Sequence, residues 1–244
     1  MDLFCGQGGA AAGYESAGFH TVGLDVVAQP RYPGHFQRGD AVAWLRWAAG
    51  ESPARPWAGC PVPSSFALIH ASPPCQDFCQ LKSLAGSRGA RGPATGWMLM
   101  ETLRLLPLVE DRWGTAWVVE NVPGAAAAMP APARLCGTQF GLRARCRDGQ
   151  TRELRRHRLF SASFFWLAPS ARCYHQAPPM SVTGRGAPDG RSWPGWTDDA
   201  RALMRCPWMT RDGLSQAVPP AYTRLIGEQF KLALDCAQEA RAAA

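Results

Sequence analysis

The stretch "ASPPCQDFCQ", residues 71–80, holds a cysteine thiol in a stiff setting. Pro73 and Pro74 restrict the backbone directly before Cys75, and the strand-like run 66–70 leads the chain to that point. A thiolate is a strong nucleophile, and loops at the carboxyl ends of parallel strands often carry such groups. A lone cysteine is more often buried and inert. The sequence "PPCQ" fits poorly inside a sheet, however, so we interpret Cys75 as a nucleophile.

An acidic side chain ends another apolar run. "VVENVPG" places Glu120 and Asn121 at the end of a strand that has the composition of a buried one. Burial would raise the pKa of Glu120 and leave a carboxylic acid able to donate a proton near neutral pH. Capping a helix or bracing a loop is the alternative role for this carboxylate.

Basic side chains alternate in "LRRHRLF", residues 154–160. Arg156 and Arg158 would share one face of a predicted strand, with Arg155 and His157 on the other face. An exposed basic strand edge is the alternative interpretation.

A glycine-rich turn lies at the start of the chain, in "DLFCGQGG", residues 2–9. A strand that feeds such a turn into a helix lets backbone amides approach a ligand closely. Asp25 ends the next predicted strand, where an acid can accept ribose hydroxyls, and Asp40 could bind an adenine amino group. No Gly-Lys-Ser/Thr follows, so this is not a Walker loop. The pattern indicates an adenosine-containing cofactor without a triphosphate; a purely structural tight turn is the alternative.

Predicted strands and helices alternate over the first part of the chain. Apolar runs predict strands at 2–5, 20–25, 66–70 and 116–120, and helical spacing predicts helices after the glycine turn, at 40–47 and at 95–112 with a bend near Pro107. Asp40 is a plausible helix cap. This alternation predicts an α/β protein with a doubly wound, mostly parallel, Rossmann-like sheet.

The pattern changes in the second part of the chain. Residues 161–210 are rich in Trp, Pro, Gly and Arg without a clear period, and we interpret them as a small separate module or a large insertion. The run 217–238 is amphipathic and should pack back on the sheet as a helix. We therefore expect residues 1–160 plus 211–244 to form one domain and 161–210 another.

Composition limits the class of protein. With 244 residues and 46% hydrophobic content the chain can bury a sizeable core, and no run approaches the roughly 18 apolar residues of a membrane span. No signal peptide is visible, so we expect a cytoplasmic protein without membrane association. A net charge of +7 favours a polyanionic partner, although a GC-rich genome would explain the many arginines equally well.

Nine cysteines, an odd number, suggest free thiols in a cytoplasmic chain. A zinc site could be assembled from Cys136, Cys146, Cys173, His175 and Cys206. No CxxC occurs, and we expect no metal.

In order along the chain, "DLFCGQGG", "PPCQ", "ENV", "RHR" and "QAVPP" resemble the motifs of C5-cytosine DNA methyltransferases. The resemblance spans the chain from Asp2 to about Phe230, except for 161–210. It implies an S-adenosyl-L-methionine-dependent methyltransferase fold, double-stranded DNA as substrate, and a target-recognition module formed by 161–210. It also implies a monomer in the cytoplasm of a bacterium or phage-infected cell. A cognate restriction endonuclease is a possible partner, but no feature of this sequence indicates one.

The resemblance implies a catalytic role for each matching residue. Cys75 would attack C6 of a flipped cytosine, and Glu120 would protonate N3. Arg158 would hold O2 of the base, and Asn121 would position the loop around Cys75. Of the family's Gln-x-Arg-x-Arg, only Arg156 and Arg158 carry over, because Leu154 replaces the glutamine.

Cofactor and DNA contacts are implied in the same way. Phe4 would stack on adenine, Gly6 and Gly8 would lie near the methionine part, and Asp25, Asp40, Pro74 and Ala217 would complete the cofactor site. Where the family has Gly-Asn-Ala/Ser-Val, this chain has "SQAV" at 215–218. In "TGRGAPDGRSWPGW" we expect Arg185 and Arg191 to contact guanine edges or phosphates; a solvated loop is the alternative.

Three other functions fit the same motifs. An RNA cytosine-C5 methyltransferase would share the catalytic residues, and a catalytically idle DNA-binding relative would share the fold. A different alkyl donor with the same nucleophile is the third alternative, because "SQAV" departs from the family at the cofactor edge.

Overall fold

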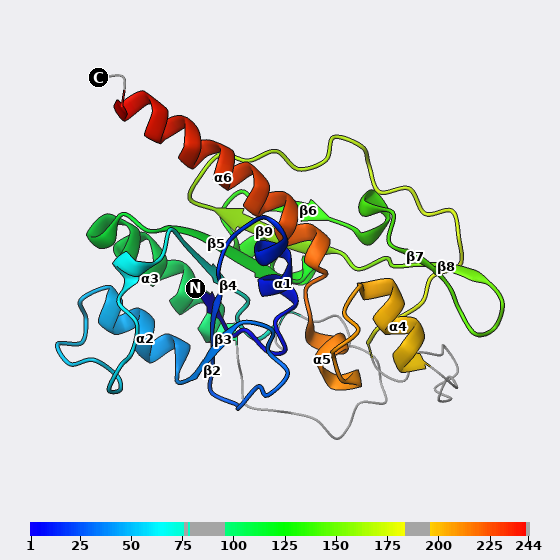
Figure 1. The fold of residues 1–244 in the computed structure, drawn as a ribbon, viewed down its shortest axis with the longest axis horizontal. Coiled ribbons are helices and arrows are strands. Elements are labelled where there is room, and N and C mark those ends of the chain that lie inside the picture. The colour runs from blue at the N-terminus through cyan, green and yellow to red at the C-terminus, as the bar shows by residue number, and fades with distance from the viewer. Residues whose placement is uncertain (76–77, 79–95, 184–195, 243–244) are drawn as a thin grey trace.

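The computed structural model describes residues 1–75, Phe78, 96–183 and 196–242, without the side chains of 240–242. Its central sheet has seven strands, which are β1 (Asp2–Leu3), β2 (Val22–Asp25), β3 (His35–Arg38), β4 (Leu68–Ala71), β5 (Ala116–Asn121), β6 (Ala133–Leu135) and β9 (Arg158–Ala162). Their order across the sheet is β3-β2-β1-β4-β5-β9-β6 (Figure 1). The first five are parallel, and β9 runs antiparallel to both of its neighbours.

Helices cover both faces of this sheet. On one face lie α1 (Gly9–Ser16) and α6 (Pro220–Ala242), and on the other lie α2 (Ala41–Ala48) and α3 (Gly96–Trp113). Alternate strand residues supply the two cores: Leu68 and Val118 pack with α1 and α6, whereas Ile69 and Val119 pack with α2 and α3. The predicted doubly wound, Rossmann-like fold is confirmed.

The chain reverses its direction of travel across the sheet between β1 and β4. From β1 it passes outward through β2 to β3, then returns to β4 beside β1 and continues to β5 in the opposite direction. In open α/β sheets ligands bind outside the carboxyl ends of the strands at such a reversal. The residues after β1, β2, β4 and β5 are therefore the ones positioned to form a site.

The predicted elements are present with shifted ends, and several elements were missed. Asp40 caps α2, because its Oδ1 accepts from the backbone N–H groups of Val42 and Ala43, and α3 continues through Pro107. The missed elements are β3, β6, the hairpin strands β7 (Arg143–Arg145) and β8 (Thr151–Glu153), and the helices α4 (Trp196–Met204) and α5 (Arg211–Gln216).

Most of residues 163–183 have no regular secondary structure, although they are part of the packed molecule. The core on the α1 and α6 face continues without a break into Leu142, Met180, Trp196 and Leu203. The boundary of a separate module at residue 161 stays a prediction.

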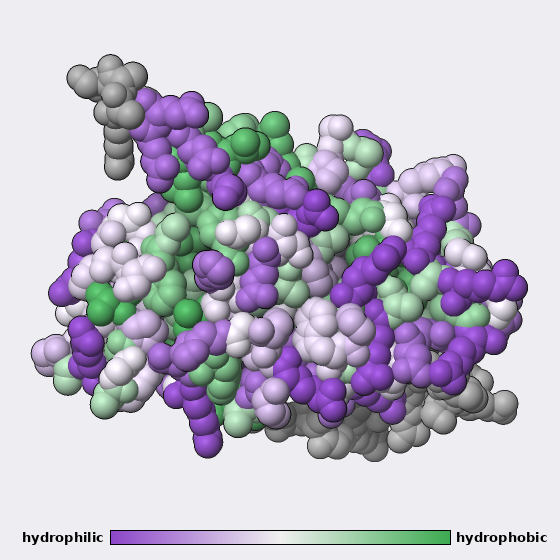
Figure 2. All heavy atoms as spheres, viewed as in Figure 1, coloured by the Kyte–Doolittle hydropathy of each residue, from purple (hydrophilic) through white to green (hydrophobic). Residues whose placement is uncertain are grey.

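In Figure 2 the projecting end of α6 carries mainly hydrophilic side chains. None of the helices in the described part of the chain is both long and apolar enough to cross a membrane.

Candidate active site

A cavity of about 640 Å³ lies where the strand order reverses. Its walls come mainly from residues at and after the carboxyl ends of the five parallel strands β1 to β5. Arg158 of β9, the start of α3 and the segment 212–218 that leads into α6 complete them. This volume is in the range of small-molecule sites. The predicted site residues that line it are Phe4, Gly6, Asp25, Asp40, Pro74, Cys75, Glu120, Arg158 and Ala217.

Other predicted site residues lie elsewhere. The side chains of Asn121 and Arg156 lie behind the cavity wall, and Gly8 lies at the start of α1, outside the lining. Arg185 and Arg191 lie outside the described residues.

The turn after β1 forms one end of the cavity. Phe4 has a φ of 57°, which is uncommon for a residue with a Cβ, and Gly6 follows with a φ of 48°. The Gly6 N–H donates to Asp25 Oδ2 at 3.0 Å, and the Val27 N–H donates to Asp25 Oδ1 at 2.9 Å. Asp25 therefore joins the turn after β1 to the turn after β2.

Gly6 and Gly8 are glycines for different reasons. A Cβ on Gly6 would meet no atom within 4 Å, whereas a Cβ on Gly8 would lie 2.4 Å from Cδ of Pro33. Gly6 keeps open space at the cavity, and Gly8 allows the close packing of the turn against the 32–33 segment.

Glu120 is buried at the end of β5 beside Arg158. Arg158 Nε lies 2.9 Å from Glu120 Oε1, but the contact lacks hydrogen-bond geometry, so among the described residues Oε1 has no hydrogen-bond donor. Burial raises the pKa of Glu120, opposed by the charge of Arg158 and by a hydrogen bond from Ser72. Glu120 can therefore carry a proton at a higher pH than an ordinary glutamate.

A buried chain of polar side chains lies behind Glu120. Ser72 Oγ is 2.9 Å from His70 Nε2, and Tyr14 OH is 3.0 Å from His70 Nδ1. Burial lowers the pKa of His70 to about 3, so its ring is neutral. This network was not predicted from the sequence. The histidine inside the otherwise apolar β4 is its one signal, because Tyr14 lies 56 positions away and the spacing of the two residues does not indicate the contact.

The loop that holds Cys75 is fixed from the end of β5. Asn121 Nδ2 donates to the Pro73 carbonyl oxygen at 3.1 Å, and the Val122 N–H donates to Asn121 Oδ1 at 2.9 Å. A Cβ on Gly124 would lie only 2.0 Å from the Phe78 carbonyl oxygen, so the two segments touch through their backbones. This geometry sets the position of the thiol relative to Glu120.

Arg156 and Arg158 do not share a strand face, and this part of the sequence prediction is wrong, because β9 begins only at Arg158. Arg156 is buried, and its Nε and Nη2 donate to the carbonyl oxygens of Ala217 and Ser215 at 2.8 and 2.7 Å. Arg156 thus holds the cavity wall at 215–217, while Arg158 faces the cavity.

Another contact missed from the sequence joins the glycine turn to the start of α5. Gln7 Nε2 donates to Thr210 Oγ1 and the Thr210 N–H donates to Gln7 Oε1, both at 2.8 Å. Trp208 Nε1 also donates to the Gln7 carbonyl oxygen at 2.8 Å. Trp97, Met98 and Asp212 add to the lining and were likewise not predicted.

No protein-family model matches the chain, and no curated protein matches it. Among solved structures it is similar to a mutant of DNMT2 from Spodoptera frugiperda, with 12% sequence identity and a TM-score of 0.38. The match covers 76% of this chain and 58% of that one, so this chain spans less than two thirds of the DNMT2 structure's length.

Proposed function

We propose that the chain is a DNA (cytosine-5-)-methyltransferase that uses S-adenosyl-L-methionine. One observation carries the proposal: a single cavity is lined at one end by the glycine turn with Asp25 and Asp40, and elsewhere by Cys75, Glu120 and Arg158. A nucleoside cofactor and a nucleophile with an acid beside it can therefore meet in one space.

The residues at the β1 end of the cavity fit the cofactor. Gly6 leaves room where a side chain would intrude, and Asp2, at the cavity wall, has a buried Oδ1 with no hydrogen-bond partner among the described residues. Phe4 can stack on a purine, and Asp25 and Asp40 can accept from ribose hydroxyls and the adenine amino group. When bound there, S-adenosyl-L-methionine supplies an electrophilic methyl group on a sulfonium.

Cys75 and Glu120 make the cytosine reactive. C5 of cytosine is too weak a nucleophile to take a methyl group unaided. The Cys75 thiolate forms a bond to C6, Glu120 gives its proton to N3, and the ring becomes an enamine that is nucleophilic at C5. After C5 is methylated, a base such as water takes the C5 proton, and N3 returns its proton to Glu120. The C5–C6 double bond forms again as the C6–S bond breaks and Cys75 leaves as a thiolate.

Arg158 and Asn121 serve this chemistry by position. Arg158 holds a positive charge beside Glu120 and can donate to O2 of the base, where negative charge gathers when C6 is attacked. Asn121 braces the backbone at Pro73, two residues before the nucleophile.

The substrate is a polynucleotide whose cytosine leaves its stack to reach the cavity. Double-stranded DNA is our proposal, with Arg185 and Arg191 as base or phosphate contacts, and the net charge of +7 suits such a polyanion. RNA contains the same cytosine base, so RNA is the alternative substrate that the experiment below compares with duplex DNA.

Covalent trapping tests both the reaction and the substrate. We expect duplex DNA containing 5-fluorocytosine to form a complex that survives denaturation in the presence of S-adenosyl-L-methionine, because fluorine at C5 blocks the final elimination. Cys75→Ser should abolish this complex, whereas Cys236→Ser, which changes an exposed cysteine of α6, should not.

Two results would contradict the proposal. A complex that persists in Cys75→Ser would show that another group is the nucleophile. Trapping of 5-fluorocytidine transfer RNA but not of duplex DNA would assign the enzyme to RNA.

A further inference from the structure

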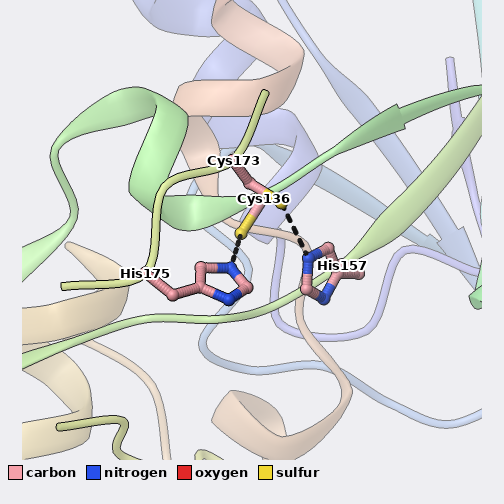
Figure 3. Close-up of side chains that lie close together, drawn as sticks. All are labelled: Cys136, His157, Cys173 and His175. Carbon is pink, nitrogen blue, oxygen red and sulfur yellow. Dashed lines mark hydrogen bonds between the residues drawn. The ribbon is translucent and has the colours of Figure 1, made fainter. Parts of the chain in front are cut away.

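Four potential metal ligands from three parts of the chain lie close together (Figure 3), and none of them lines the cavity. The ligand atoms of Cys136, His157, Cys173 and His175 all lie within 4.8 Å of one another. Cys136 Sγ is 3.5 Å from His175 Nε2, and Cys173 Sγ is 3.5 Å from His157 Nε2. Tetrahedral zinc with bonds of about 2.3 Å to sulfur and 2.0–2.1 Å to nitrogen would separate sulfur from nitrogen by about 3.5 Å.

The sheet supplies two of these side chains. Leu135 of β6 is paired with Arg158 of β9 in an antiparallel ladder, so the next positions outward, Cys136 and His157, face each other where the pairing ends. Cys136 is also fixed by its backbone N–H, which donates to Gln139 Oε1 at 2.8 Å.

The other two side chains come from the irregular segment. Cys173 and His175 are two residues apart within 163–183, a stretch with almost no regular secondary structure. Segments of this length without secondary structure are uncommon in compact domains unless other contacts order them. Hydrogen bonds hold the 163–183 segment in place on either side of the cluster. Gln139 Nε2 donates to the Ala171 carbonyl oxygen before it, and the Gln176 and Ala177 N–H groups donate to Glu153 Oε2 after it.

We propose that Cys136, His157, Cys173 and His175 bind one zinc ion that fastens the 163–183 segment to the edge of the sheet. Two thiolates and two imidazoles in a compact group are a donor set that suits zinc. Four protein ligands leave no open coordination position, so the site is structural. Binding forms two Zn–S and two Zn–N bonds and releases the two thiol protons, leaving a neutral centre.

Neighbouring groups support the ligands. Thr138 Oγ1 lies 3.3 Å from Cys136 Sγ and can donate to a thiolate, as outer-shell partners do. Three of the four ligand residues are wholly or partly buried, and only His175 is exposed. No metal was expected from the sequence, because CxxC is absent. Of the five candidate ligands named there, Cys146 and Cys206 are not in the cluster, and His157 is in it although it was not a candidate.

The zinc site plays no part in the proposed methyl transfer, but it lies next to Arg158, which lines the cavity. His157 directly precedes Arg158, whose Nη1 donates to the His157 carbonyl oxygen at 2.9 Å. A bound ion would fix this backbone, and its loss should disturb the segment and Arg158 without removing a catalytic group.

The first measurement is the metal content of the unmodified protein. We expect elemental analysis of chain purified without chelator to find one zinc per molecule. Cobalt in place of zinc should give the visible bands of a tetrahedral site with thiolate charge transfer. A chelator that strips zinc should lower the melting temperature.

Variants then assign the ligands. His175→Gln, at an exposed position, and Cys173→Ser should each weaken zinc binding by more than the about 10–100-fold lost with an outer-shell partner. The matched controls His35→Gln and Cys236→Ser change an exposed histidine and cysteine elsewhere and should keep full zinc content.

Three results would overturn the proposal, and the first two use unmodified protein, so they do not depend on a variant that folds. The first is purified protein that contains no zinc and also fails to take up cobalt. The second is a Cys136–Cys173 disulfide, found by peptide mapping under non-reducing conditions. The third is an unchanged zinc affinity in His175→Gln.

Discussion

Glu120 is under two opposing influences. Burial favours its protonated form, while Arg158 at 2.9 Å favours its ionised form, and burial prevails in raising the pKa. An acid beside an arginine is usually ionised at neutral pH. Here the enclosed position lets Glu120 hold its proton to a higher pH than usual, with a positive charge beside it, as the proposed protonation of N3 would require.

The acid predicts a pH dependence. Because the pKa is raised, the protonated form persists to higher pH than usual, and methyl transfer should fall as the pH rises through that pKa. Glu120→Gln should lower the single-turnover rate by about 10²–10⁴-fold, with little change in DNA affinity. It should also remove this alkaline decline. Near-normal turnover in Glu120→Gln would give the carboxyl group a structural role instead.

Alanine at Gly6 should mainly lower cofactor affinity, whereas alanine at Gly8 should mainly lower stability. Both have positive φ values, of 48° and 78°, so alanine should cost about 1–2 kcal/mol of stability at either position. Gly8→Ala should cost about 1–3 kcal/mol more, because its Cβ meets Pro33. Gly6→Ala should mainly weaken cofactor binding, since its Cβ points into open space at the cavity. Urea unfolding and calorimetry measure both effects, and identical losses would contradict this division.

At the level of elements, the wall of the cavity at 215–217 depends on Arg156. Its guanidinium is buried, and burial together with the charge of Arg158 lowers its pKa to about 9. It donates to two carbonyl oxygens just before α6, and the Tyr222 hydroxyl of α6 donates to the Arg156 carbonyl oxygen. The segment before β9 and the start of α6 are thus bound to each other.

Arg156→Lys should loosen this wall. Lysine cannot reproduce the two-pronged geometry, and a hydrogen bond to a charged group is worth about 1.5–3 kcal/mol. We expect the free energy of unfolding to fall by about that amount and cofactor affinity to weaken through Ala217. Arg158→Lys, the matched control, should change turnover more than stability. Unchanged stability with lost turnover in Arg156→Lys would restore Arg156 to direct contact with the base.

How far the sequence predicts these elements depends on burial. The apolar runs next to turns predicted four strands, β1, β2, β4 and β5. A doubly wound sheet brings the carboxyl ends of these strands to one edge, so the motifs that follow them were expected at one site. β3 was missed because "HFQR" is short and only half buried, with no period to detect. α4 was missed because its surroundings are rich in Trp, Pro and Gly.

Contacts between distant residues escape sequence reasoning for a different reason. The partners Gln7 and Thr210 lie 203 positions apart, and Tyr14 and His70 lie 56 apart. Nothing in the spacing of either pair indicates that they meet. His157 was missed from the metal cluster for the same reason, because only the pairing of β6 with β9 brings it beside Cys136.

At the scale of the whole molecule, one apolar core extends into the region predicted to be a separate module. Leu203 of α4 belongs to the same cluster as Tyr14 of α1 and Tyr222 of α6. The described part of the 161–210 region is therefore packed on the main core.

This shared core predicts a single unfolding transition. Leu203→Ala should destabilise the whole chain by about 2–5 kcal/mol, because it empties a buried position. Leu232→Ala, where the side chain is 64% exposed, should have little effect. Hydrogen exchange of β4 and α4 amides should report the same loss. A separate early transition confined to α4 would instead support an independent module at 161–210.

The packing of α6 on α1 has a consequence for how the protein is made. The Thr223 hydroxyl donates to the Ala10 carbonyl oxygen across 213 positions, which at about 5–20 residues per second corresponds to roughly 10–40 s of translation. Gly13 lies so close to α6 that a Cβ would be 2.0 Å from Thr223 Oγ1. On the ribosome, α1 therefore emerges long before its partner, and Ala217, which lines the cavity, emerges just ahead of α6. A nascent chain therefore contains Cys75 and Glu120 early and completes the wall of the cavity only near the end of synthesis.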